Sequence, residues 1–285
     1  MPLTRRQTLE ELSKIGHRPR KQLGQNYLVD GNIVAKSLAL AEVEAGDRVV
    51  EIGPGLGTLT RSLLEAGAEV WAAEFDPEMV DYLNQAVVPR SEQRLHLLAG
   101  DAVKYPRAGL PIEQAEQGFK VVANLPYAVS TPWMDAVLQA PLPTRMVIML
   151  QRETADRFSA DPGSKKFGAI SIVLQSAFDV LKGHPVPHSC FHPAPEVDSY
   201  LLNLRRKQAP FIFSPETRQL MRLLFQQRRK QIGSLVKKTG SITALTWIDK
   251  ISEMGFDSRT RPEDLPIRAW QQLETGGRES SEVSD

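Results

Sequence analysis

Short apolar runs alternate with helical stretches between about residues 32 and 204, and this alternation limits the possible folds more than any other feature of the chain. Seven runs are candidate strands: residues 48–52, 69–75, 95–99, 119–124, 146–150, 172–180 and 200–204. Helical candidates lie at residues 58–66, 77–85, 132–139 and 153–160. The first five runs are short, continuous and rich in Val, Ile and Leu, which is typical of strands buried on both faces of a parallel sheet. The pattern predicts a doubly wound α/β domain.

The pattern changes near residue 205, after which no strand signal remains. Ser214-Pro215-Glu216 is a helix start, with a capping hydroxyl and a proline at the first helical position. We expect one helix from there to about Lys238, ended by Gly240, and two shorter helices at 242–254 and 267–273. The expected parts of the chain are a flexible basic arm at 1–20, an α/β domain at 21–208, a small all-helical domain at 209–274 and a disordered polar tail at 275–285.

Composition excludes several classes of protein. Cys190 is the only cysteine, which rules out an internal disulfide and a multi-cysteine zinc site. His184, His188 and His192 recur every four residues, but the prolines among them forbid the helix that would bring them together over a metal. The apolar runs are too short to span a bilayer, and residues 1–20 lack the apolar segment of a secretory signal. We expect a cytoplasmic protein with no membrane segment and no bound metal.

Positive charge is gathered into patches, although the formal net charge is only +1. Residues 205–238 contain ten Lys or Arg and a single acid, Glu216, and the N-terminal arm is basic as well. Such patches are typical of surfaces that bind phosphate, and the alternative is a solvated helix face next to a disordered arm.

A glycine-rich segment, Glu51-Ile52-Gly53-Pro54-Gly55-Leu56-Gly57, follows the first strand and opens a helix. Such a loop lets the backbone approach a ligand closely, but dinucleotide-binding folds use similar loops. Glu74 ends the second strand, where a carboxylate can accept ribose hydroxyls, and Gly100-Asp101-Ala102 follows the third strand. Asp101 could also be a simple helix cap. Together the three elements favour S-adenosylmethionine, because each lies at the carboxyl end of a successive strand.

Asn124-Leu125-Pro126-Tyr127 follows the fourth strand at the same edge. The side-chain oxygen of Asn124 can accept one hydrogen of a planar amino group, and the carbonyl of Leu125 or Pro126 can accept the other. Tyr127 can stack on the attached base. The tetrapeptide is therefore suited to N6-methylation of adenine, with catalysis mainly by positioning. The alternative is an ordinary turn, in which Asn, Pro and Tyr are common.

Residues 191–199 form a second distinctive segment, stiffened by Pro193 and Pro195. Phe191 could close the far face of a pocket for an extruded base, since two rings would then enclose it. The alternative is that the segment is a buried loop anchor.

In the order and spacing of these motifs the chain resembles the KsgA (RsmA) family of small-subunit ribosomal RNA adenine dimethyltransferases. The motifs shared with that family are Lys21-Gln22-Leu23-Gly24-Gln25-Asn26-Tyr27-Leu28, the glycine loop, Glu74, Asp101, residues 124–127, Leu150-Gln151-Arg152-Glu153, residues 191–199 and Phe225-Gln226-Gln227-Arg228-Arg229-Lys230. The chain departs from the family at Ala128, where Asn is frequent, and at Gln231-Ile232-Gly233-Ser234, where Thr and then Asn are usual.

The resemblance implies a Rossmann-like class I methyltransferase fold with a mostly parallel sheet, S-adenosyl-L-methionine as cofactor and S-adenosyl-L-homocysteine as product. It assigns cofactor binding to Gln25, Asn26, Leu28, Gly53, Gly55, Gly57, Glu74, Phe75, Asp101, Ala102 and Asn124. It assigns the target adenine to Asn124, Leu125, Pro126, Tyr127 and Phe191. RNA binding falls to Arg152, Arg228, Arg229 and Lys230, the last three on a predicted helix.

By the same resemblance the substrate is a pair of adjacent adenosines in the 3′-terminal hairpin loop of 16S rRNA, each dimethylated at N6 within the assembling 30S subunit by a monomeric enzyme. Three alternatives remain at this point. They are a related 23S rRNA adenine methyltransferase of the antibiotic-resistance type, a nicotinamide-dependent oxidoreductase that uses the glycine loop, and a non-enzymatic assembly factor.

Overall fold

A computed structural model of the chain describes residues 2–275. The chain divides into two compact units, Met1–Ala155 with Asp179–Arg206 and Asp156–Phe178 with Lys207–Asp285, which we call the α/β unit and the helical unit. The chain leaves the α/β unit for the last time after Arg206, close to the expected domain boundary at residue 208. Residues 156–178 were expected in the α/β domain but belong to the helical unit. The expected tail lies outside the described residues, apart from Thr275.

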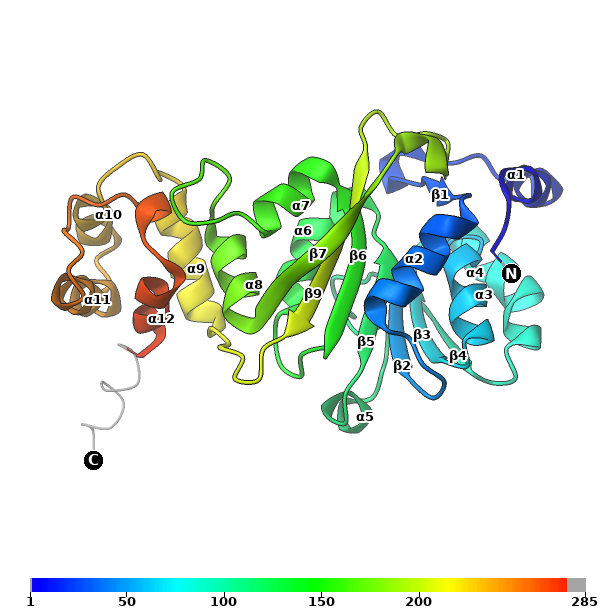
Figure 1. The fold of residues 1–285 in the computed structure, drawn as a ribbon, viewed down its shortest axis with the longest axis horizontal. Coiled ribbons are helices and arrows are strands. Elements are labelled where there is room, and N and C mark those ends of the chain that lie inside the picture. Colours follow the sequence, from blue (N-terminus) through cyan, green and yellow to red (C-terminus); the bar gives the residue numbers. More distant parts are fainter. Residues whose placement is uncertain (1, 276–285) are drawn as a thin grey trace. The chain divides into compact units, whose positions relative to one another are not determined.

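The α/β unit is built on a seven-stranded sheet with the order β4-β3-β2-β5-β6-β9-β7 (Figure 1). Its strands are β2 (Arg48–Ile52), β3 (Glu69–Glu74), β4 (Leu95–Ala99), β5 (Lys120–Asn124), β6 (Arg145–Gln151), β7 (Phe178–Val186) and β9 (Ser199–Arg206). β2 to β6 pair in parallel, and β9 pairs with β6 antiparallel. The expected mostly parallel, Rossmann-like sheet is therefore confirmed.

The strand order reverses between β2 and β5. From β2 the chain steps outward through β3 to β4, then returns to place β5 on the other side of β2. Ligands of open α/β sheets bind at the carboxyl ends of strands that flank such a reversal. The loops after β2 and β5, which carry the glycines and Asn124, are thus neighbours by topology.

Helices cover the sheet because alternate side chains of each strand face opposite sides. The helices of this unit are α1 (Arg5–Lys14), α2 (Gly31–Ala41), α3 (Thr58–Glu65), α4 (Pro77–Ala86), α5 (Ile112–Glu116), α6 (Ser130–Val137) and the start of α7 (Arg152–Phe158). One buried cluster joins Val49, Val70 and Val122 of the sheet to Ile33 of α2 and Leu63 of α3. This packing fixes the ends of the strands, and with them the loops that follow.

The N-terminal residues differ from the expected flexible arm. Residues 5–14 form the helix α1, which begins at a capping box in which Thr4 and Gln7 satisfy each other's backbone N–H groups. Leu12 of α1 is buried in the core, and the guanidinium of Arg5 donates to the carbonyl oxygens of Ser189 and Phe191, at 2.9 and 3.0 Å. The basic composition of residues 1–20 gave no indication of these anchoring contacts.

The apolar run at 172–180 is not a single strand, so that prediction is wrong. Residues Ala169–Ala177 form the helix α8, and β7 begins only at Phe178. The backbone N–H of Gly168 donates to the Ser171 hydroxyl at 3.1 Å, which fixes the start of the helix. A short, mostly apolar run cannot distinguish a buried helix from a buried strand, and here a local cap decides for the helix.

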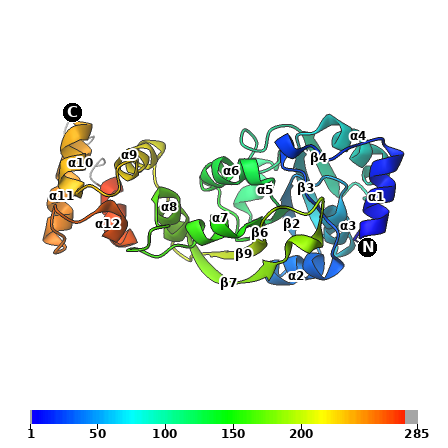
Figure 2. The same cartoon turned by 90° about the horizontal axis from the view of Figure 1, so that it is seen from above.

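The helical unit gathers α8 with α9 (Pro215–Phe225), α10 (Ile232–Thr239), α11 (Ile242–Glu253) and α12 (Ile267–Thr275), as Figure 2 shows. Its centre is aromatic: the rings of Trp247 and Trp270 lie 4.9 Å apart, and Phe225 lies 5.2 Å from Trp270. The indole N–H of Trp247 donates to the carbonyl oxygen of Ala269 at 2.7 Å. The expected all-helical character of the C-terminal region is confirmed.

The single helix expected from Ser214 to Lys238 is wrong, because the chain turns between α9 and α10. The backbone N–H groups of Ile232 and Gly233 donate to the carbonyl oxygens of Thr260 and Ser258, each at 2.8 Å, instead of to a preceding helical turn. Gly233 permits this approach, since a Cβ there would lie 2.9 Å from the Ser258 Cβ. Residues 226–230 therefore form a turn and not helix.

We predict that Gly233→Ala destabilises the helical unit, because the added methyl group clashes with the backbone and side chain of Ser258. The expected loss is about 1–3 kcal/mol in the free energy of unfolding, measured by urea denaturation. Gly168→Ala is the matched control, since a Cβ at Gly168 meets no atom within 4 Å. Equal stability of the two variants would contradict the clash.

Candidate active site

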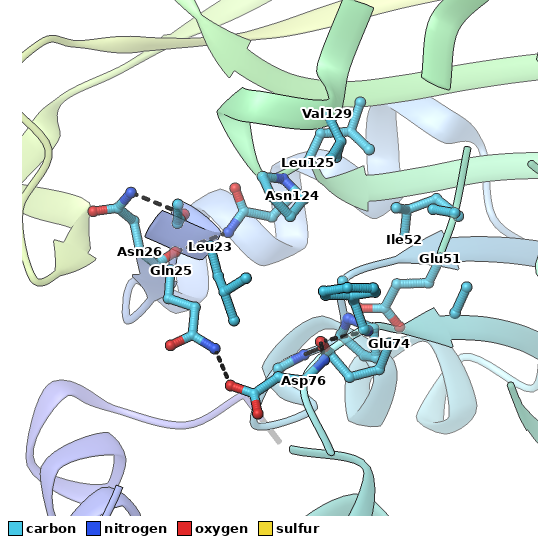
Figure 3. A pocket seen from close by; sticks show the side chains of 18 of the residues that line it. Leu23, Gln25, Asn26, Glu51, Ile52, Glu74, Asp76, Asn124, Leu125 and Val129 are labelled. Carbon is cyan, nitrogen blue, oxygen red and sulfur yellow. Dashed lines mark hydrogen bonds between the residues drawn. The ribbon is translucent and has the colours of Figure 1, made fainter. Parts of the chain in front are cut away.

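One cavity of about 270 Å³ lies at the carboxyl edge of the sheet in the α/β unit (Figure 3). Its walls come from segments that are far apart in the sequence: residues 22–28, 51–56, 58–59, 73–76, 100–102 and 124–129. Its size approaches the usual range of small-molecule sites, which begins at about 300 Å³. Each of the four motifs placed at the end of a predicted strand therefore contributes to a single cavity.

The glycine loop after β2 brings its backbone against two other walls of the cavity. Gly53 and Gly55 have φ angles of 68° and 56°, which disfavour any residue with a Cβ. A Cβ at Gly53 would lie 3.2 Å from ring atoms of Pro126, and one at Gly55 would lie 3.0 Å from the ring of Tyr27. Gly57 caps α3 with φ 73° and is not among the residues that line the cavity. The expected contact of Gly57 with the cofactor stays a prediction, because Gly57 does not line the cavity.

Glu51 is a buried carboxyl group in the cavity wall, with an exposed fraction of 2%. The Thr60 hydroxyl donates to Oε2 of Glu51 at 2.7 Å. Burial outweighs this bond and raises the pKa of Glu51 to about 8. The nearby Glu74 carboxylate adds to the increase.

Glu74 lies at the end of β3 and is held by backbone donors. Its Oε2 accepts the N–H of Gly55 at 3.0 Å, and its Oε1 accepts the N–H groups of Phe75 and Asp76, each at 2.9 Å. Burial raises the pKa of Glu74, although these bonds favour its ionised form. A carboxylate has about four acceptor sites, so about one remains for a ligand. The ring of Phe75 is 64% exposed beside it, at the rim of the cavity.

Asp101 and Ala102 follow β4 and line the cavity. One carboxylate oxygen of Asp101 accepts the backbone N–H of Val103 at 2.9 Å. No helix begins here, because the next one, α5, starts only at Ile112, so the alternative of a helix cap does not describe Asp101. The carboxylate holds a local turn, and the residue also lies in the cavity wall.

Asn124 ends β5, and its amide is held in a defined orientation. Nδ2 donates to the backbone carbonyl oxygen of Asn26 at 3.1 Å, which leaves Oδ1 as the atom available to accept a hydrogen bond from a ligand. The Pro126 carbonyl oxygen accepts the N–H of Val129 at 3.1 Å. Leu125 lies between them in the cavity wall, and its side chain is buried.

Tyr127 begins the short turn after this loop and lines the cavity. Its hydroxyl pairs with the buried Ser199 hydroxyl of β9 at 2.7 Å. Burial raises the pKa of Tyr127, so the phenol stays neutral. The pairing anchors the hydroxyl end of the ring.

The N-terminal segment supplies the remaining wall. Gln25, Asn26 and Leu28 line the cavity, as the resemblance implied, with Leu28 in the short strand β1 (Tyr27–Leu28). Sequence reasoning missed Asp76, which lies 1% exposed in the same wall and accepts the Gln25 amide N–H at 2.6 Å (Figure 3). Asp76 also caps the start of α4, so it serves the helix and the cavity wall together.

Phe191 lies outside the cavity, whereas the sequence placed it in the pocket for the target base. It lies in β8 (Phe191–His192), which pairs with β1 so that Phe191 faces Leu28 across the two strands. Its side chain is 0% exposed within the core and does not line the cavity. In this structure it cannot contact a base in the cavity, and the alternative of a buried anchor describes its position.

The four residues expected to bind RNA differ in their contacts and in their exposure. The Arg152 guanidinium lies over the Tyr200 ring, 4.8 Å from its centre, in the α/β unit. In the helical unit, Arg228 donates to the Lys165 carbonyl oxygen and lies 3.5 Å from the Glu263 carboxylate. Arg229 and Lys230 are exposed on the turn that follows α9. Arg228 is therefore engaged within the protein, whereas its two neighbours face solvent.

Two further findings apply to residues 2–275. None of their helices combines the length and apolar character that crossing a membrane requires. Nor do their His, Cys, Asp and Glu side chains form a group of three or more placed to hold a metal ion.

We predict that Glu51→Gln changes how stability depends on pH. Because the unfolded chain loses the Glu51 proton near pH 4.5 and the folded chain keeps it until about pH 8, the native protein loses stability as pH rises through that window. The variant has no such proton, so its free energy of unfolding should exceed the native value most at and above about pH 8. Urea denaturation across this range measures the difference. Glu113→Gln, at an exposed position of α5, is the control, and parallel profiles for Glu51→Gln and the native chain would contradict the prediction.

Solved structures resemble this fold. A dimethyladenosine transferase from Plasmodium falciparum superposes with a TM-score of 0.70 and 24% identity, covering 89% of this chain and 98% of that one. The 23S rRNA methyltransferase ErmE superposes with a TM-score of 0.63 and 21% identity, covering 88% and 99%. At these identities the likeness concerns the fold alone.

Sequence relatives extend over nearly the whole chain. A protein of Opitutus terrae named ribosomal RNA small subunit methyltransferase A is 56% identical over 274 residues, which are 96% of this chain and 99% of the relative. A protein of the same name from Chlamydia caviae is 37% identical over 270 residues, 92% and 93% of the two chains. The family model described as ribosomal RNA adenine dimethylase matches residues 16–273. The chain therefore belongs to the ribosomal RNA adenine dimethylase family.

Proposed function

We propose that this protein transfers methyl groups from S-adenosyl-L-methionine to N6 of two adjacent adenosines in the 3′-terminal hairpin loop of 16S rRNA, giving dimethyladenosines and S-adenosyl-L-homocysteine. The observation that carries the proposal is the placement of Asn124 and Tyr127 in the wall of the same cavity as the glycine loop. A donor held by the loop would thus lie next to an amide suited to an amino group.

The residues of the cavity fit the cofactor. Backbone at Gly53 and Gly55 can approach it closely, Glu74 keeps about one acceptor site for a ribose hydroxyl, and Asp101 can accept from an adenine amino group. Phe75 offers an exposed ring at the rim. When bound, S-adenosyl-L-methionine supplies an electrophilic methyl group carried by a sulfonium.

Asn124 holds the target nitrogen. Because its Nδ2 is committed to the Asn26 carbonyl oxygen, Oδ1 accepts one N6 hydrogen of the adenine. The Leu125 carbonyl oxygen is the better acceptor for the other hydrogen, since that of Pro126 already accepts the Val129 N–H. Two acceptors on the amino hydrogens turn the nitrogen lone pair toward the donor and weaken its conjugation with the ring. Catalysis is then mainly alignment for in-line transfer.

Tyr127 provides a stacking surface for the base. The 2.7 Å pairing with Ser199 anchors the hydroxyl end of its ring, so less of its position must be ordered when the base arrives. The adenine must leave its stack to enter, which is easiest for a nucleotide in a hairpin loop. No strong general base is required, because the nitrogen becomes acidic on methylation and releases its proton afterwards.

The choice of the small subunit rests on the sequence relatives. Those at 56% and 37% identity carry the name ribosomal RNA small subunit methyltransferase A, whereas the 23S rRNA enzyme ErmE resembles this chain in fold at 21% identity. Membership of the family also favours a methyltransferase over a nicotinamide-dependent oxidoreductase. We further propose that the protein acts as a monomer on the assembling 30S subunit in the cytoplasm, and any role as an assembly factor would accompany this activity.

We predict that Asn124→Ala lowers kcat about 100-fold or more, because the variant loses the acceptor that orients the amino nitrogen. The measurement is mass spectrometry of nucleosides from immature 30S particles incubated with enzyme and cofactor. Asn84→Ala, at an exposed position of α4, is the matched control and should leave dimethyladenosine formation unchanged.

Two outcomes of this experiment would count against the proposal. Full dimethylation by Asn124→Ala would remove the catalytic role of the amide. Modification of naked 23S rRNA but not of 30S particles by the native protein would transfer the activity to the other subunit.

We predict that Arg229→Ala and Lys230→Ala each weaken binding to a 16S rRNA hairpin fragment and lower the salt dependence of binding by about one unit of slope. Both side chains are exposed, so each can reach a phosphate. Titrations at increasing KCl give the slopes, with Lys36→Ala on α2 as a control of equal charge loss. An unchanged slope for both variants would place the RNA contacts elsewhere.

A further inference from the structure

A polar cluster, buried at His17 and Asp76, joins the N-terminal segment to the start of α4 beside the cavity. His17 is its centre, with 1% of its side chain exposed. Nδ1 of the ring lies 2.5 Å from Oε2 of Glu78, and Nε2 lies 3.0 Å from Oε1 of Gln25 and 3.9 Å from Oδ2 of Asp76. The Arg20 guanidinium pairs with both Asp76 and Glu78.

The orientation of the Gln25 amide is determined by its other partners. Oε1 accepts the backbone N–H of Arg20 at 2.8 Å, and Nε2 donates to Asp76 at 2.6 Å. The opposite orientation would set two donors against each other at Arg20 and two acceptors against each other at Asp76. Nε2 of His17 therefore carries a proton and donates it to Gln25.

A second proton must lie between His17 and Glu78. At 2.5 Å, two lone pairs would repel, so one proton lies between Nδ1 and Oε2 whichever partner holds it. His17 thus bridges Gln25 on one side and Glu78 on the other. Its ring also meets that of Tyr27 edge-on, with centres 6.5 Å apart, and a Cβ at Gly55 would touch the Tyr27 ring.

We propose that His17 is a positioning residue that fastens residues 17–26, which we call the N-terminal clasp, over the cofactor. The clasp lines the cavity through Gln25 and Asn26, and the Asn26 carbonyl oxygen accepts the Asn124 amide N–H. Closing the clasp therefore completes the cofactor wall and orients the amide that meets the target. This inference rests on the proposed function, because it takes S-adenosyl-L-methionine as the ligand of the cavity.

The test compares cofactor affinities by calorimetry with S-adenosyl-L-methionine, and KM and kcat with 30S particles. For His17→Ala, Kd for the cofactor should rise about tenfold, and KM for the cofactor should rise by more than kcat falls. His96→Ala is the matched control: His96 forms a similar pair with Glu69, at 2.8 Å between neighbouring strands, and neither residue lines the cavity. Its Kd should equal the native value.

Two substitutions at Glu78 separate a bridging hydrogen bond from simple packing. In Glu78→Gln the amide N–H can donate to Nδ1 of a neutral His17 ring whose Nε2 keeps its proton, so Kd should stay within about twofold of the native value. Glu78→Leu removes the bridge at a half-exposed side chain and should weaken binding as His17→Ala does. If His17→Ala fails to fold, as judged by circular dichroism, Glu78→Leu carries the test.

The outcomes distinguish the inference from the function on which it rests. If the native protein does not bind S-adenosyl-L-methionine, the proposed function fails. If the native protein binds it and His17→Ala or Glu78→Leu binds equally well, the function stands and the clasp does not. Equal weakening by Glu78→Gln and Glu78→Leu would also overturn the bridge.

Discussion

The packing of Pro126 against Gly53 is the contact on which the rest of the site depends. It exists because β2 and β5 are adjacent where the strand order reverses, so that their following loops meet. A side chain at Gly53 would strike the proline ring at 3.2 Å, and the clasp lies beside the same loop at Gly24. The wall that receives the methyl donor and the wall that receives the amino group are therefore one structure. Backbone packing, and not a flexible side chain, fixes the distance between them.

Periodicity predicted the five parallel strands well, because burial on both faces leaves a continuous apolar run with polar ends. It failed at residues 172–180, where a mostly apolar run interrupted by polar residues contains most of α8 and the start of β7. It failed again after Phe225, where the helix stops because Ile232 and Gly233 donate to carbonyl oxygens of Thr260 and Ser258. Those partners lie too far along the chain for any local pattern to show them.

The residues of the site were also predicted only in part from the sequence. Glu74, Asp101 and Asn124 could be placed from the sequence because a strand end fixes where a residue lies in a parallel sheet. Phe191 could not, since its direction depends on pairing between β1 and β8, each only two residues long. So short a strand offers no alternation from which to choose the side that faces the cavity. Asp76 was missed for a related reason: its partner Gln25 is 51 residues away.

The carboxyl groups in the cavity wall bear on how such a site would distinguish the methyl donor from its product. Glu74 is buried beside Glu51, and its carboxylate contributes to the raised pKa of Glu51. A cationic ligand favours ionised carboxylates near it, whereas the thioether product of methyl transfer has one positive charge fewer. Buried carboxylates in the wall would therefore contribute to a preference for the methyl donor over its product. This preference suits an enzyme that must exchange cofactor repeatedly on one substrate, since each dimethylated adenosine consumes two donors.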